Sequence, residues 1–101
     1  MKKFVVERVL PGAGILTPQE LQSMAETSCE VAVRMGKPYH WIESYVTDDK
    51  IYCIVITESE DVVREHARLA KFPINTVSEV QAVIDPLTSN PIYHLKPALS
   101  M

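Results

Sequence analysis

Hydrophobic and polar residues alternate most clearly in the stretch 41–56, WIESYVTDDKIYCIVI. Aromatic and β-branched residues lie on both sides of the segment 47–50, which contains two aspartates. Turn-forming residues between two such runs are typical of a β-hairpin. Because side chains alternate along a strand, each face of this hairpin has its own composition. The pattern predicts two antiparallel strands with chemically different faces.

The register of the hairpin decides which residues share a face. With Asp48 and Asp49 as the loop, Tyr45 lies opposite Tyr52. One face then carries an aromatic and aliphatic set with one carboxylate, namely Trp41, Glu43, Tyr45, Tyr52, Ile54 and Ile56. The other face carries Ile42, Ser44, Val46, Ile51, Cys53 and Val55.

Helical periodicity marks two further segments. Residues 17–20, Thr-Pro-Gln-Glu, have the form of a capping box with proline at the first helical position, and hydrophobic residues recur at helical spacing until Gly36. A second helix is predicted to begin at a similar capping box, residues 57–60, and to run to about Ala70. The hydrophobic stripe of this helix includes His66, which is therefore predicted to point inward.

Strands are also predicted at 4–10 and 76–84, which gives the element order βαββαβ. With right-handed crossovers, this order predicts an α+β, ferredoxin-like domain over residues 1–86, a four-stranded antiparallel sheet with both helices on one face. Residues 87–101 contain prolines and no periodicity. They are predicted to form a tail that is either mobile or laid across a partner subunit.

The second face of this sheet has no predicted cover. An aromatic and aliphatic surface of that extent is unfavourable in water, and a second copy packed sheet against sheet buries it. The sequence therefore predicts a homodimer.

Composition and charge narrow the function. The chain of 101 residues is long enough for one core, and a net charge of −3 without a Lys/Arg cluster excludes binding to a nucleic-acid backbone. The N-terminal hydrophobic run is too short for a signal peptide or a membrane span, so we expect a cytoplasmic protein that does not bind membranes. Cys29 and Cys53 lack a C-x-x-C spacing and are predicted to be free thiols.

Potential chemistry lies on the helix-facing side of the hairpin. Cys53 and Ser44 are cross-strand neighbours there, and His66 descends toward them from the second helix. A sulfur and an imidazole nitrogen near one point suit a soft metal ion or a cysteine activated by histidine. The structural alternative is a cysteine that packs as a small hydrophobe and a histidine that hydrogen-bonds to backbone or to a carboxylate.

On the opposite side, Glu43 is predicted between two aromatic residues, where a dimer interface removes it from water. Such a carboxylate needs a metal ion or a cation to stay ionised. Glu7 or Arg8 on the first strand reaches the same region, and the sequence does not fix which of the two points there. An intersubunit salt bridge from Glu43 to Arg8 or Lys50 is the alternative to a ligand role.

Four motifs in order resemble a family of small bacterial nickel-binding proteins of ill-defined function: FVVERVLPG, W-x-E-S-Y-V-T-x-D-K-x-Y-C, V-R-E-H-A-R-x-A-x-F-P and V-x-x-V-I-D-P. The resemblance covers residues 1–86. It implies a ferredoxin-like protomer of the dimeric α/β-barrel superfamily, a sheet-to-sheet homodimer, and nickel or another divalent transition metal as cofactor. The residues that match its motifs are Glu7, Arg8, Trp41, Ser44, Tyr45, Lys50, Tyr52, Cys53, Glu65, His66, Phe72 and Pro73.

Imidazole suits nickel, and thiolate or carboxylate ligands can complete such a site. The predicted metal ligands are accordingly His66, Cys53, Glu7 and Glu43. The residues predicted to form a pocket or an interface are Arg8, Trp41, Ser44, Tyr45, Lys50, Tyr52 and Glu65. Two alternatives stay open: an enzyme of oxygenase, isomerase or decarboxylase type with a small-molecule pocket, and a non-catalytic dimeric interaction module.

Overall fold

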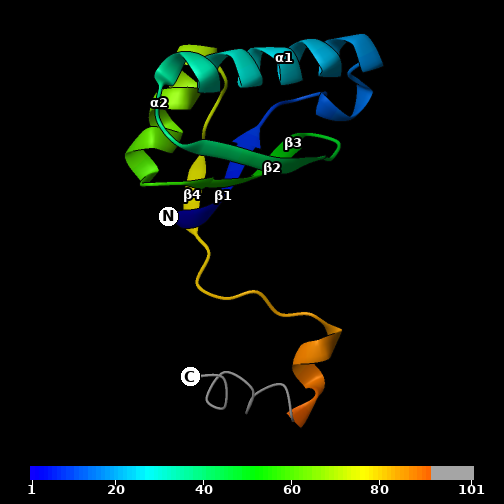
Figure 1. The fold of residues 1–101 in the computed structure, drawn as a ribbon. Helices are drawn as coiled ribbons and strands as arrows, with labels where there is room; N and C mark the ends of the chain where they lie inside the picture. Colours follow the sequence, from blue (N-terminus) through cyan, green and yellow to red (C-terminus); the bar gives the residue numbers. More distant parts are fainter. Residues whose placement is uncertain (92–101) are drawn as a thin grey trace.

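The computed structural model describes residues 1–91, whose strands form one antiparallel sheet in the order β2-β3-β1-β4. The strands are β1 (Lys2–Val9), β2 (Tyr39–Val46), β3 (Lys50–Thr57) and β4 (Thr76–Glu79). Helices α1 (Pro18–Met35) and α2 (Glu60–Ala70) both cover the same face of this sheet (Figure 1). The order of elements and the two-layer arrangement confirm the predicted ferredoxin-like α+β fold.

Local signals set the ends of α1 as predicted. The Thr17 hydroxyl accepts a hydrogen bond from the Glu20 backbone N–H, and the Glu20 carboxylate accepts one from the Thr17 N–H. Gly36 ends the helix in the left-handed conformation, with φ of 65°. Residues with a side chain rarely adopt that conformation, so glycine suits this position.

The second predicted capping box is wrong. Thr57 is the last residue of β3, fully buried, and its hydroxyl donates to the Pro38 carbonyl just before β2. α2 begins instead after Ser59, whose side chain makes no capping hydrogen bond. Because the threonine side chain satisfies a carbonyl in the sheet layer, it is not available to the helix.

The hairpin register is confirmed near the loop, where Tyr45 lies opposite Tyr52. A β-bulge at Ile42 then changes the alternation, and Trp41 pairs with Val55 instead of lying on the face of Tyr52. The predicted position of Trp41 on the open face is therefore wrong. Ile42, predicted to face the helices, is 54% exposed.

β4 is shorter than predicted, because its pairing with β1 ends at Glu79. After β4 the described chain runs away from the sheet to a short 3-10 helix, η2 (Pro86–Ser89) (Figure 1). Most of the predicted tail, residues 92–101, lies outside the described residues. Neither α1 nor α2 combines the length and hydrophobicity that a membrane span needs, and residues 1–91 contain no other helix that does.

Candidate functional site

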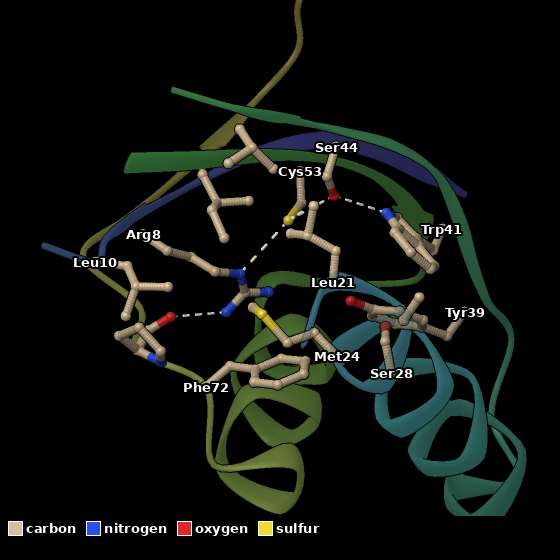
Figure 2. A pocket seen from close by; sticks show the side chains of 14 residues that line it. Arg8, Leu10, Leu21, Met24, Ser28, Tyr39, Trp41, Ser44, Cys53 and Phe72 are labelled. Carbon is tan, nitrogen blue, oxygen red and sulfur yellow. Dashed lines mark hydrogen bonds between the residues drawn. The ribbon is translucent and has the colours of Figure 1, made fainter. Parts of the chain in front are cut away.

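A cavity of about 240 Å³ lies between the sheet and α1, next to the core that is built around Phe4, Val6 and Val55 (Figure 2). β1, β2 and β3 form one wall, α1 forms the other, and the segment after α2 closes one end. The residues that line it are Arg8, Leu10, Leu21, Met24, Ala25, Ser28, Tyr39, Trp41, Ser44, Val46, Ile51, Cys53, Phe72 and Pro73.

The sheet side of the cavity carries a chain of hydrogen bonds that ends on a sulfur atom. The Trp41 indole N–H donates to Ser44 Oγ at 2.9 Å, and the Ser44 hydroxyl donates to Cys53 Sγ at 3.0 Å. Arg8 Nε donates to the same sulfur at 3.5 Å (Figure 2). Ser44 and Cys53 meet as cross-strand partners, and the bulge turns Trp41 toward them. The bulge thus completes this polar wall.

Arg8 is buried in the wall, with only 4% of its surface exposed. Its Nη1 donates to the Pro73 carbonyl at 2.8 Å, and its guanidinium carbon lies 5.6 Å from the centre of the Phe72 ring. Within residues 1–91, no carboxylate lies within salt-bridge distance of this guanidinium. A carbonyl, a sulfur and an aromatic face are therefore its partners in the described chain.

His66 is not part of the cavity lining, and its hydrogen-bond partner among the described residues is Ser28 and not Cys53 or Ser44. It is 1% exposed and stacks on the Tyr39 ring with 4.2 Å between ring centres. His66 Nε2 is 3.0 Å from the Ser28 carbonyl oxygen, which can only accept, so Nε2 carries the proton. Within residues 1–91, the buried Nδ1 has no hydrogen-bond partner. Burial lowers the pKa of His66, the hydrogen bond to Ser28 opposes this shift, and the nearby Arg8 charge adds to it.

Tyr39 brings a phenol to the cavity (Figure 2). Burial raises the pKa of Tyr39 to about 12. The hydroxyl is therefore protonated at neutral pH and can serve as a hydrogen-bond donor.

The remaining predicted site residues lie away from the cavity. Glu7 faces the helix-free side of the sheet, where it pairs with Lys50 at 3.0 Å, and this hydrogen bond lowers the Glu7 pKa. Glu43, on the same side, accepts a hydrogen bond from the Tyr45 hydroxyl, which raises the Tyr45 pKa. Glu65 pairs with Lys37 at the surface.

The sequence left open whether Glu7 or Arg8 points to the open face of the sheet, and the structure decides between them. Arg8 points into the cavity, and Glu7 points to the open face. Tyr45 and Tyr52 also lie on the open face, so Trp41 is the one aromatic residue of the predicted pocket that lines the cavity.

The family described as "Nickel responsive protein SCO4226-like" matches residues 4–80. The chain belongs to the SCO4226-like family. The crystal structure of SCO4226 from Streptomyces coelicolor A3(2) is similar, with a TM-score of 0.69 and 18% sequence identity over 81% of this chain and 99% of that chain. At this identity the likeness shows a common fold. A comparison with curated proteins finds no match.

The metal ligands predicted for this SCO4226-like chain do not form one site within a protomer. His66 and Cys53 lie on the helix-covered side of the sheet, whereas Glu7 and Glu43 lie on the other side. In residues 1–91, no group of three or more His, Cys, Asp or Glu side chains is placed to hold a metal ion. Cys53 and Glu43 lie on the two sides of the sheet on which the sequence placed them, so the sheet separates the two pairs of predicted ligands.

Sequence reasoning missed Tyr39, Leu21 and Met24 as cavity residues. Leu21 and Met24 belong to the predicted hydrophobic stripe of α1, which was assigned to packing alone. A signal for Tyr39 existed, because it stands two residues before Trp41 and shares its face of the strand. This spacing places Tyr39 in the cavity only when Trp41 is known to face the helices, and that depends on the bulge.

Proposed function

We propose that each protomer binds a small organic molecule in the cavity. The observation that carries the proposal is the cavity itself, because protein interiors normally close to the density of organic crystals. Its volume of about 240 Å³ exceeds the roughly 150 Å³ of an apolar cavity that accepts benzene. A mostly apolar lining with a few convergent polar groups is typical of ligand sites.

The single tryptophan of the chain, Trp41, lines the cavity, so its fluorescence reports on occupancy. We expect benzyl alcohol to change this fluorescence with a saturable titration curve. Ala25 on α1 lines the cavity, and Ala25→Leu should fill it and weaken binding about tenfold or more.

Ala82→Leu makes the same chemical change at an exposed position outside the cavity and should bind as the unmodified protein does. Equal binding by Ala25→Leu, or no saturable signal from the unmodified protein, would contradict the proposal. A backbone amide spectrum of each variant checks that its fold is retained.

A second candidate function is the binding of a divalent transition metal, nickel in the first place, and membership of the SCO4226-like family favours it. Since one protomer offers no three-residue ligand group in residues 1–91, we propose that the ion lies between two copies of the chain on the open sheet face. Glu7 and Glu43 lie there, and the bulge puts His40 opposite Ile56 on the same face. Imidazole and carboxylate ligands together suit nickel.

Calorimetric titration of tag-free protein with Ni²⁺ tests this second candidate. His40→Gln and Glu43→Gln should each weaken binding by about tenfold or more, because each removes one ligand. His66→Gln is the control and should leave affinity unchanged. Nickel affinity that falls in His66→Gln but not in His40→Gln or Glu43→Gln would exclude the open face as the metal site.

We expect a cytoplasmic location, which suits two free thiols, Cys29 and Cys53.

A further inference from the structure

We infer that the ligand of the cavity is a small organic carboxylate, with an apolar body and a charged end that meets Arg8. This inference rests on the proposed binding function of the cavity and names its ligand class. It depends on three features of the described chain: an uncompensated buried charge, unused hydrogen-bond donors, and the shape of the apolar wall.

The charge of Arg8 is the first feature. The four ion pairs of residues 1–91 join side chains that are at least 26% exposed, whereas Arg8 is 4% exposed and has no carboxylate partner there. Burying a cation without a counter-ion is unfavourable. A bound anion would supply the missing counter-charge, so the free protein is preorganised to attract one.

The donors of Arg8 are the second feature. A guanidinium has five N–H groups. One is used by Cys53 and one by Pro73, and Figure 2 shows the remaining nitrogen directed into the cavity. Two parallel N–H groups fit the two oxygens of a carboxylate. The protonated Tyr39 hydroxyl offers a further donor to the same space.

The apolar wall is the third feature and limits the size of the ligand. Leu21, Met24 and Phe72 supply apolar side chains to the lining around Arg8 (Figure 2). The volume suits one ring, or a short aliphatic chain, together with the charged group. A phosphate ester is less suitable, because such groups are usually held by several cations or backbone N–H groups.

A competing explanation makes Cys53 the counter-ion. The Cys53 sulfur accepts hydrogen bonds from Arg8 and Ser44, as a thiolate would. In that case the charge of Arg8 is already balanced, and an anionic ligand would bind little more tightly than its neutral counterpart. The two explanations differ in what happens when the sulfur is removed, so Cys53→Ala distinguishes them.

The test compares carboxylates with their neutral amides: benzoate with benzamide, phenylacetate with phenylacetamide, and 3-phenylpropionate with 3-phenylpropionamide. Binding is followed by Trp41 fluorescence and by backbone amide shifts. In the unmodified protein we expect at least one carboxylate to bind about tenfold or more tightly than its amide. Arg8→Met, which keeps an unbranched stem and removes the charged guanidinium, should abolish that preference, and its backbone amide spectrum checks that the fold is retained.

Each outcome has a distinct meaning. Equal binding of acids and amides, alongside binding of benzyl alcohol, would overturn the carboxylate inference and leave the proposed function standing. A carboxylate preference that arises only in Cys53→Ala would also overturn it and assign the counter-charge to Cys53. A preference that persists in Arg8→Met would place the anion elsewhere. Failure of benzyl alcohol and of all six compounds to bind would reject the proposed function itself.

Discussion

At the scale of single residues, His66 shows how a group suited to metal binding can serve packing instead. Its ring is stacked on Tyr39, its Nε2 is hydrogen-bonded to Ser28, and its Nδ1 is buried. The same contacts that hold the ring in place leave no coordination position accessible. A histidine in this environment is maintained in its neutral form, because protonation would bury a charge beside Arg8.

This environment predicts a pH dependence of stability. Burial lowers the His66 pKa below its usual 6.5, so between the folded and unfolded pKa values the unfolded chain binds more protons. The free energy of unfolding should therefore fall as pH drops below about 6.5, by at most about 1.4 kcal/mol per pH unit from this residue. Above that pH its contribution is constant.

Urea unfolding of the unmodified protein and of His66→Phe, measured from pH 7.5 to 5, checks this expectation. The phenyl ring retains the stack on Tyr39 without a titrating group, so the difference in unfolding free energy between the two proteins should change below about pH 6.5 in favour of the variant. A difference that is independent of pH would show that His66 is not maintained in its neutral form by the fold.

At the scale of elements, the sequence predicted those features that depend on neighbours in the chain. The caps of α1, the hairpin loop and the pairing of Tyr45 with Tyr52 all follow from local residue chemistry. The bulge at Ile42 does not follow from local residue chemistry. It is associated with a tertiary contact, because it brings Trp41 to Ser44 on the cavity side. No pattern of alternation along β2 marks that change of face.

The same distinction explains the wrong start of α2. Residues 57–60 satisfy the local pattern of a capping box, but the Thr57 hydroxyl is taken by the Pro38 carbonyl, which is distant in sequence. Cys53 and Glu43 lie on the sides of the sheet that the sequence predicted, because the register near the loop follows from the turn. Trp41 lies on the other side from the one predicted, because the bulge at Ile42 changes the alternation.

At the scale of the whole molecule, the two faces of the sheet differ in what covers them. The cavity lies on the helix-covered face. The opposite face has no helix over it in residues 1–91 (Figure 1). The central strands present Val5, Tyr52, Ile54 and Ile56 on that open face, and Tyr45 beside them is 52% exposed. We expect a second copy of the chain to cover this surface, because an isologous contact would bury both apolar faces at once.

The open face therefore predicts a homodimer that a single charge should break. Ile54→Arg places a cation at the centre of the face, where an interface would remove it from water without a counter-ion, and we expect at least about a hundredfold weaker association. Val33→Arg is the matched control, since Val33 is 81% exposed on α1 and lies on the other layer. Analytical ultracentrifugation should find Val33→Arg dimeric and Ile54→Arg monomeric at the same concentration.

The same pair of variants distinguishes ligand binding in the cavity from nickel binding on the open face. Each cavity is built from residues of one protomer, so Ile54→Arg should still bind benzyl alcohol with nearly unchanged affinity. A nickel ion held between two copies would instead be lost together with the dimer, and Val33→Arg should keep it. A monomeric Ile54→Arg that binds nickel as tightly as the unmodified protein would show that the ion does not need the interface, and a dimeric Ile54→Arg would move the interface off the open face.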